Sequence, residues 1–294
     1  MPADHIASAM AAGDYVRVLA ARTTDVVIEA QARHGCSPTA TAALGRLLTG
    51  AAMMGFALNG RERIALQIAG DGPVRSIHAE IRSEGRVRGY VQEPLADVPL
   101  NSRGKFDVAA LIGSGSLHIT RTFDSGQPYT SAVRLVSGEI GEDLAHYFAR
   151  SEQIPTIVAV GVLAGPRGVV AAGGVLAQLL PGADDDTARA LEERAKQLTS
   201  VSALIQNGST PDDLILGLAA DLSPRITAHH DVSFACSCDR DRVIKALLGF
   251  GRAQLENMAR EDEVTEARCD FCGATYHFGR DELREIVAAA TTSA

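Results

Sequence analysis

Four of the five cysteines lie in two close pairs near the end of the chain. The first pair is Cys236-Ser237-Cys238, and the second, thirty residues later, is Cys269-Asp270-Phe271-Cys272 followed by Gly273. Four thiolates complete a tetrahedral shell that suits Zn²⁺ and disfavours magnesium or calcium. A glycine after the second pair fits a zinc knuckle, whose chain turns tightly so that backbone amides point at the sulfurs. The spacing therefore predicts a zinc site, although an iron–sulfur cluster or a plain thiol cluster would use the same residues.

The same thiols could also carry redox chemistry. Thiolates are the oxidisable form of cysteine, and each close pair contains its own resolving partner for a sulfenic acid. Cysteines two or three positions apart can bring their Cα atoms within the roughly 4.4–6.8 Å that a disulfide needs. Oxidation could therefore replace one metal by two disulfides. Spacing alone favours the simpler interpretation, a permanent structural zinc site.

Charge is distributed as unevenly as cysteine. Residues 1–180 carry 16 basic and 16 acidic side chains, residues 181–231 carry 4 and 9, and residues 232–294 carry 8 and 11, which together give the net charge of −8. An acidic chain is a poor candidate for generic electrostatic binding to nucleic acid, so no nucleic-acid partner is expected. The absence of an apolar run near ~18 residues and of a signal layout predicts a cytoplasmic protein with no membrane partner.

An α+β fold is predicted for residues 1–180, as a mixed α/β domain with antiparallel strands. Ser37-Pro38 reads as the N-cap and first residue of a helix that runs toward Leu58. A short helix is expected over 142–151. Strands separated by turn residues are expected over 15–21, 61–69, 74–81, 86–91, 117–122, 129–136, 156–163 and 169–175.

The remaining chain divides into two further segments. Residues 181–231 contain no Phe, Tyr or Trp but show helical periodicity around 191–205 and 214–222, which predicts a helical linker. Such amphipathic helices are stable only when docked on another element, so the linker is expected to be metastable. Residues 232–294 form the predicted zinc-binding domain, which is small enough to depend on its metal.

Several motifs together resemble a known family, the thirty-three-kilodalton heat-shock proteins, which are redox-regulated holdase chaperones of bacteria. The most specific motif is the cysteine layout itself. Others accompany it along nearly the whole chain: Phe234 before the first pair, Tyr276 and Phe278 after the second, Gly113-Ser114-Gly115-Ser116-Leu117, the run from Tyr147 to Gln153, and Gly173-Gly174 leading to Gln178 and Pro181. One departure is Asp239, where the family often has a serine, and it places only the capping of the next helix in question.

This resemblance implies a mechanism. All four cysteines, Cys236, Cys238, Cys269 and Cys272, would hold one Zn²⁺ per chain in the reduced, inactive state. Peroxide or hypochlorous acid acting with heat would form the disulfides Cys236–Cys238 and Cys269–Cys272, release zinc and unfold the linker. The oxidised protein, expected as a homodimer, would then hold unfolded or oxidatively damaged client proteins without ATP. The family carries out no catalysis, so no catalytic residue is assigned and the protein is not expected to be an enzyme.

Two other functions stay open from the residues alone. One is a thiol–disulfide oxidoreductase in which Cys269 attacks and Cys272 resolves, although no thioredoxin-like strand and helix flank this pair. The other is a constitutive zinc-ribbon interaction module, whose zinc content and activity would not respond to peroxide.

A few further residues have plausible chemistry but a simpler interpretation. His229-His230 and His277 are expected to be solvated, because four thiolates already complete the metal shell. Cys36 at a helix start is expected to be an inert thiol. Met53-Met54 could contact clients but is expected in the core, and residues 113–116 form a turn that lacks the full phosphate-loop pattern.

Overall fold

The computed structural model describes residues 3–165, 168–198 and 200–291. The chain forms two compact units, residues 1–235 and 236–294. The mixed α+β class with antiparallel sheets is as predicted. Residues 181–231 belong to the first unit in this structure. The predicted boundaries at residues 180 and 231 therefore stay a prediction, which concerns the segments that would unfold separately.

Two sheets build the first unit. Sheet A has the order β10-β1-β2-β9-β8, and sheet B has the order β11-β5-β4-β3-β6-β7. The strands of sheet A are β1 (His5–Ala11), β2 (Val16–Arg22), β8 (Thr156–Gly165), β9 (Gly168–Leu179) and β10 (Arg225–Asp231). Those of sheet B are β3 (Arg63–Gly70), β4 (Ser76–Arg82), β5 (Arg86–Val91), β6 (Gly115–Thr122), β7 (Tyr129–Arg134) and β11 (Ser233–Phe234). All described pairs are antiparallel except β11 with β5. Every predicted strand of residues 1–180 is present; β1 was not predicted.

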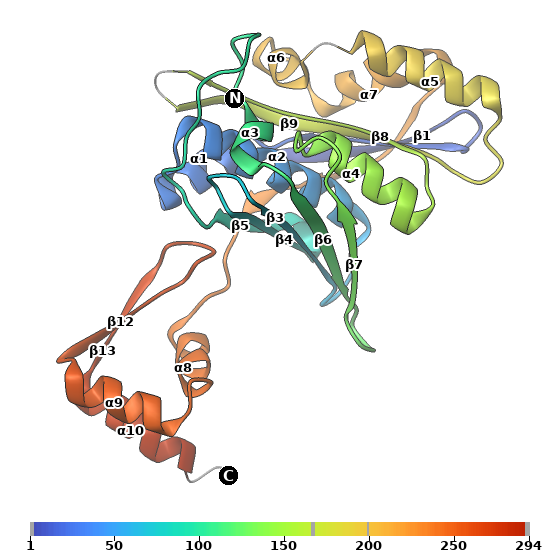
Figure 1. Ribbon diagram of the computed structural model, residues 1–294. Helices are drawn as coiled ribbons and strands as arrows, with labels where there is room; N and C mark the ends of the chain where they lie inside the picture. The colour runs from blue at the N-terminus through green and yellow to red at the C-terminus, as the bar shows by residue number, and fades with distance from the viewer. Residues whose placement is uncertain (1–2, 166–167, 199, 292–294) are drawn as a thin grey trace. The chain divides into compact units, whose positions relative to one another are not determined.

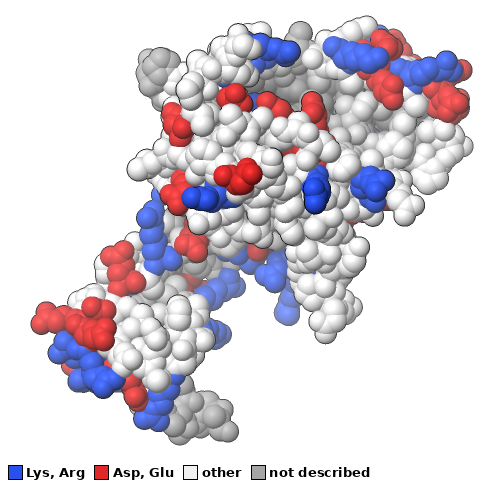
Figure 2. Space-filling view, in the orientation of Figure 1, with Lys and Arg blue, Asp and Glu red and all other residues white. Residues whose placement is uncertain are grey.

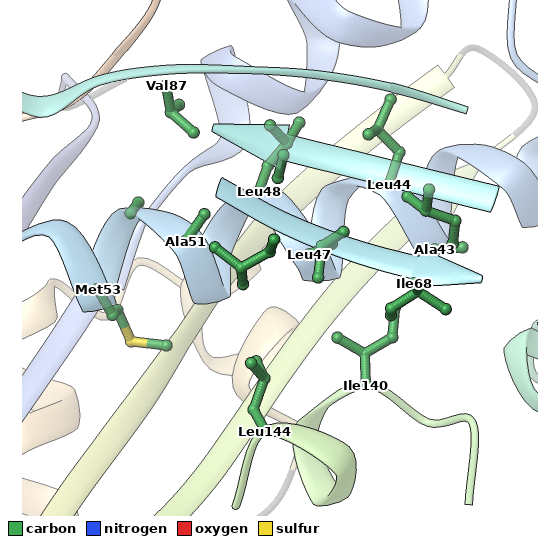
Figure 3. Packing of buried hydrophobic residues seen from close by; sticks show 14 of the residues in the cluster. Ala43, Leu44, Leu47, Leu48, Ala51, Met53, Ile68, Val87, Ile140 and Leu144 are labelled. Atoms are coloured by element: carbon green, nitrogen blue, oxygen red, sulfur yellow. The ribbon is translucent and has the colours of Figure 1, made fainter. Parts of the chain in front are cut away.

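Helix α2 (Pro38–Met54) lies at the centre of this unit. Its start is as predicted, because Ser37 Oγ accepts a hydrogen bond from the backbone N–H of Ala40 and a proline follows the cap. Figure 3 shows its leucines packed among side chains from other elements; labelled are Leu44, Leu47, Leu48, Val87 and Leu144. Among the described residues only Pro38–Ala57 is long and apolar enough to cross a membrane, and 78% of that window is buried in the core.

Shorter helices surround this core. The sequence did not reveal α1 (Thr24–His34), whose mean hydropathy is low and whose first turn is capped by a distant residue just before β1: the backbone N–H of Val26 donates to Asp4 Oδ2 at 2.8 Å. The helix predicted over 142–151 is present as α4 (Gly141–Tyr147), continued by a π-helical turn (Phe148–Glu152). The remaining short elements are α3 (Val108–Ile112) and single 3₁₀ turns at Gly55–Ala57, Ser83–Gly85 and Ala220–Leu222.

Three helices cover the face of sheet A that points away from α2, as Figure 1 shows. They are α5 (Asp185–Gln197), α6 (Val201–Gln206) and α7 (Pro211–Ala219). The sheet presents mostly small side chains to them, and the helices contribute larger ones such as Leu191, Ile205 and Ile215. Their outward side is charged, and Figure 2 shows acidic and basic side chains gathered over the position of α5.

Close approach of α6 depends on two glycines. Gly161 and Gly173 lie directly opposite each other on β8 and β9. A Cβ atom on Gly173 would lie 2.3 Å from Ile205 Cδ1 and 2.2 Å from the carbonyl oxygen of Ala21. Any side chain at this position would therefore displace the helix or the neighbouring strand.

The helical prediction for residues 181–231 is correct as far as Leu222 and wrong beyond it. Arg225–Asp231 forms β10, which pairs with β1. The strand is at the edge of sheet A, and among its residues only Ile226 is a large apolar side chain. An edge strand with so little apolar content gives no periodicity for a sequence pattern to detect.

The second unit contains three helices and a hairpin. These are α8 (Arg240–Leu248), α9 (Arg252–Glu261), β12 (Val264–Arg268), β13 (Thr275–Gly279) and α10 (Arg280–Thr291). Its buried apolar core is small and has no member in common with the two clusters of the first unit: Leu247, Leu255, Ala259, Phe278, Leu283, Ile286 and Val287. A core of this size is marginal for an independent fold without an additional crosslink.

Candidate metal centre

The four cysteines predicted as ligands converge in the second unit. The Sγ atoms of Cys236, Cys238, Cys269 and Cys272 all lie within 4.8 Å of one another. The Sγ atoms of Cys238 and Cys272 are 3.2 Å apart, and those of Cys236 and Cys269 are 3.9 Å apart. A zinc–sulfur bond of about 2.3 Å places tetrahedral sulfurs about 3.8 Å from one another. The cluster thus has the size of a four-thiolate shell, and none of the four cysteines is in a disulfide.

The second pair lies in the tight turn between β12 and β13. The backbone N–H of Gly273 donates to the carbonyl of Cys269 at 2.8 Å, and Gly273 has a φ of 70°, which glycine adopts at little cost. Backbone N–H groups of Cys272 and Phe271 act on the Cys269 sulfur, and that of Ala274 acts on the Cys272 sulfur, each lowering the pKa of the thiol. The knuckle geometry expected from the glycine is confirmed.

Burial outweighs these amides when no cation is present. It is the largest cause of the raised pKa of Cys269 and of Cys272, and the neighbouring thiols raise the pKa of Cys272 further. Without a cation, Cys269 and Cys272 therefore resist ionisation. A divalent cation would reverse this balance, because it stabilises every thiolate at once.

The first pair immediately precedes α8. Asp239, the residue that departs from the family pattern, caps this helix: its Oδ1 accepts the backbone N–H of Arg242 at 2.8 Å. The side chain of Arg242 turns back and donates to the carbonyl of Ser237 at 2.6 Å. The cap that the departure placed in question is therefore present, with aspartate in place of serine.

Arg240 joins this helix to the knuckle hairpin and to α10. Its guanidinium donates to both carboxylate oxygens of Glu282, at 2.6 and 2.7 Å, and to the carbonyl of His277 at 2.9 Å. It also lies 4.3 Å from the ring centroid of Phe278. These contacts fix the chain next to Cys238 against β13, the strand that follows Cys272. No local sequence pattern indicates this role, which depends on tertiary contacts.

Tyr276 supplies a further contact to the sulfurs. Its hydroxyl donates to Cys238 Sγ at 3.3 Å, and that hydrogen bond is the main cause that raises its pKa to about 12. Outer hydrogen bonds of this kind orient metal ligands. The tyrosine had been noted only as part of the family motif, and its spacing from Cys272 gave no reason to assign it a contact with Cys238.

The other residues considered from the sequence lie apart from the cluster. His229 contacts Asp212 at 2.8 Å, and the ring of His230 stacks on Phe56 at 4.4 Å; both histidines belong to β10 of the first unit. His277 lies on β13 and is not among the clustered groups. Cys36 is buried before α2, and burial raises its pKa to about 12, which fits the inert thiol that was expected.

The donor set fits zinc. Four sulfur ligands, two of them in a turn whose amides point at the sulfurs, and an outer hydrogen bond to a third sulfur are features of a closed structural site. Oxygen-preferring cations would find no carboxylate in the cluster. An α+β unit followed by a small domain with four convergent cysteines defines a two-unit protein with a separate four-cysteine module.

Comparison with known proteins identifies the family. The chain matches the family described as Hsp33 protein over residues 4–279. The 33 kDa chaperonin of Desulforamulus reducens is 42% identical over 97% of both chains, and that of Geobacillus kaustophilus is 42% identical over 96% of this chain and 97% of its own. A crystal structure of the Thermotoga maritima 33 kDa chaperonin superposes with a TM-score of 0.93 at 37% identity, covering 99% of this chain and 100% of the other. This chain belongs to the Hsp33 family of chaperones, and its four-cysteine cluster fits a redox switch.

Proposed function

We propose that this protein is an oxidation-activated holdase of the cytoplasm, which binds unfolded or oxidatively damaged clients without ATP. Zinc bound by Cys236, Cys238, Cys269 and Cys272 maintains the reduced, inactive state. Oxidation forms the disulfides Cys236–Cys238 and Cys269–Cys272, and the oxidised protein acts as a homodimer. The observation that carries this proposal is the convergence of the four cysteine sulfurs within 4.8 Å of one another.

The oxidative step balances within each cysteine pair. Zinc, when bound, keeps the sulfurs as thiolates, the form that reacts with peroxide. One thiolate attacks peroxide and becomes a sulfenic acid while the other peroxide oxygen leaves as water. The second thiol of the pair then displaces the sulfenic oxygen as water and forms the S–S bond. Each disulfide consumes one peroxide and two electrons from sulfur, and two disulfides leave no thiolate for the metal.

Loss of the metal acts on a unit with a small core. Structural zinc contributes on the order of 10–16 kcal/mol in finger-like peptides, whereas whole domains are stable by about 5–15 kcal/mol. The second unit therefore unfolds when zinc leaves. Residues 181–231 follow, because the docked helices α5–α7 carry the larger apolar side chains of their interface and expose them on release. Nine acidic against four basic residues keep the released segment soluble.

The two alternative functions have less support. In a thiol–disulfide oxidoreductase the attacking cysteine has a lowered pKa, commonly at a helix N-terminus. Cys269 instead lies in a hairpin turn, where burial raises its pKa. The pKa of Cys269 does not argue against the constitutive zinc-ribbon module. This alternative differs from the switch only because its zinc content and activity would not change on oxidation.

One experiment tests the proposal. Zinc release, free thiols and suppression of aggregation of a thermally unfolding client are measured on the same samples before peroxide, after peroxide and after reductant. We expect oxidation to release one zinc, remove four thiols and turn on aggregation suppression, with reductant and zinc reversing all three. Client holding by the reduced, zinc-loaded protein equal to that of the oxidised form would contradict the switch and favour the constitutive module. Catalytic turnover in insulin reduction would instead favour the oxidoreductase.

A further inference from the structure

The face of sheet B that points away from α2 has an unusual charge pattern. Buried residues such as Ile64, Ile81 and Val87 face α2, so their strand neighbours Arg63, Arg82 and Arg86 face the opposite side. The side chains on this outer face are exposed or half-buried, apart from Glu80. Helix α2 contacts sheet B more extensively than any other helix of the first unit, and it packs on the inner face of the sheet.

Three arginines lie in one row across this outer face. The register pairs Arg63 with Arg82 and Arg82 with Arg86, so neighbouring strands β3, β4 and β5 each place an arginine at the same level. We name these three residues the arginine row. Like charges directly opposite each other destabilise a sheet. The row therefore costs folding free energy, and an anionic ligand would offset that cost.

Acidic neighbours neutralise only part of this charge. The buried carboxylate of Glu80 contacts Arg82 at 2.8 Å and Arg88 at 2.9 Å, and the exposed Glu84 lies 3.6 Å from Arg86. Arg134 on β7 adds a further positive charge at the far side of the same face. Five arginines against two glutamates leave this face positive on a chain whose net charge is −8.

A second row carries flat rings. The register pairs Tyr90 with His78, His78 with Gln67, and Gln67 with His118, so these side chains cross four strands at one level. The rings of His78 and Tyr90 already lie parallel, with centroids 4.6 Å apart and an interplanar angle of 8°. We name Tyr90, His78 and His118 the ring row. It lies four residues along the strands from the arginine row, which is about 14 Å at about 3.4 Å per residue.

Charge and rings together select one kind of partner. Arginines bind backbone phosphates, and exposed rings on an open sheet stack on unpaired bases. An acidic polypeptide would use the arginine row but would gain little from the ring row. We propose that the outer face of sheet B binds single-stranded nucleic acid, with phosphates on the arginine row and bases on the ring row. The net charge of the chain argues against binding over its whole surface, not against binding at this localised face.

Binding of a short fluorescein-labelled oligouridylate to the reduced, zinc-loaded full chain tests this assignment by fluorescence anisotropy. Three phosphate contacts give a slope of log K against log salt of about −2, since each contributes about 0.7 on a single strand. Affinity should therefore fall about 20-fold between about 50 and 200 mM salt. In the Arg63→Gln/Arg86→Gln variant the slope should decrease by about 1.4. Arg82 is retained because it contacts the buried Glu80.

A matched control removes two exposed arginines elsewhere, Arg225→Gln/Arg252→Gln, which changes the net charge equally. This control should retain the slope of the unmodified protein. Tyr90→Leu should lower affinity at least about fivefold without changing the slope, because stacking does not release counterions. Thermal unfolding of the Arg63→Gln/Arg86→Gln variant should occur at an unchanged or higher temperature, because like-charge repulsion in the row is relieved.

Three results would overturn the proposal. The first is no saturable binding at low salt. The second is equal loss of binding in the arginine-row variant and the control variant. The third is competition by unlabelled poly-glutamate as effective as that by unlabelled oligouridylate, which would assign the face to an acidic polypeptide instead.

Discussion

The sulfur atoms of the four-cysteine cluster come together because two short turns position them. The knuckle turn around Gly273 aims backbone amides at Cys269 and Cys272, and the cap at Asp239 fixes the chain after Cys238. The sequence predicted all four members, because sulfur ligands in close pairs are a local signal. It could not predict the hydrogen bond from Tyr276 to Cys238, since that contact joins residues 38 positions apart.

At the residue scale, Cys272→Ser should abolish stoichiometric zinc binding. A serine hydroxyl is a far weaker zinc ligand than a thiolate, and three sulfurs leave the shell open. The matched control is Cys36→Ala, which removes a buried thiol outside the cluster. Zinc content after dialysis, measured with a colorimetric chelator, checks both. Undiminished zinc binding by Cys272→Ser would exclude this residue as a ligand.

Tyr276→Phe should leave the zinc stoichiometry intact but weaken affinity on the order of 10-fold. The variant removes only the hydroxyl that donates to Cys238, and outer hydrogen bonds of this type are worth about 10–100-fold in metal affinity. Competition with a chelator of known affinity measures the change. Equal affinity in both proteins would show that this hydrogen bond contributes nothing to the centre.

The unfolding free energy of the first unit should decrease as pH rises from about 4 to about 6, because of the buried carboxyl group of Asp4. Burial is the main cause that raises its folded pKa to about 6 from 3.8, against the opposing Val26 amide and Arg22. The folded state therefore holds a proton that the unfolded state has released, and the stability it contributes below about pH 4 is lost as pH rises through about 6. The contribution is on the order of 3 kcal/mol. Unfolding free energies of the unmodified protein and Asp4→Asn across this range should differ in slope, whereas Asp14→Asn, which changes a mostly exposed carboxylate beyond the other end of β1, should follow the unmodified protein.

At the element scale, the predictable strands and helices were those whose own residues show a periodic pattern. Elements that depend on hydrogen bonds to distant residues could not be predicted. Ser37-Pro38 predicts the start of α2, and the alternation of apolar and polar residues predicts most strands of sheet B. Helix α1 has its cap from Asp4 on another part of the chain, and β10 is a polar edge strand. Both depend on tertiary contacts that local propensity does not contain.

Two neighbouring residues of helix α7, one buried and one exposed, allow a test of the docking interface. Ile215→Ala removes a fully buried side chain and should weaken docking by about 2–5 kcal/mol. Hydrogen exchange of residues 211–219 should accelerate, and the reduced protein should gain some ability to suppress aggregation. Leu216→Ala is the matched control, because its side chain is 48% exposed. Equal exchange rates in the two variants would show that Ile215 does not hold the helix in place.

At the scale of the whole molecule, two units with separate cores predict two separable unfolding steps. Chelation of the metal from the reduced protein should remove exchange protection first from residues 236–294 and then from residues 181–231, while strands β1–β9 stay protected, because the seven-residue core of the second unit is small. Hydrogen exchange followed by mass spectrometry measures both regions at once. A single cooperative loss of protection across both units would contradict this independence.

The glycine pair under α6 determines what kind of surface appears when the helices leave. Gly161 and Gly173, with the buried alanines of β1, β2 and β9, give the middle of the sheet little side-chain relief, whereas the fully buried leucines and isoleucines of the interface all belong to α5–α7. In the proposed mechanism the released helices would therefore carry the largest of these side chains with them. A client would then meet flexible apolar segments, while the sheet would keep a surface of small side chains on which the same helices can dock again.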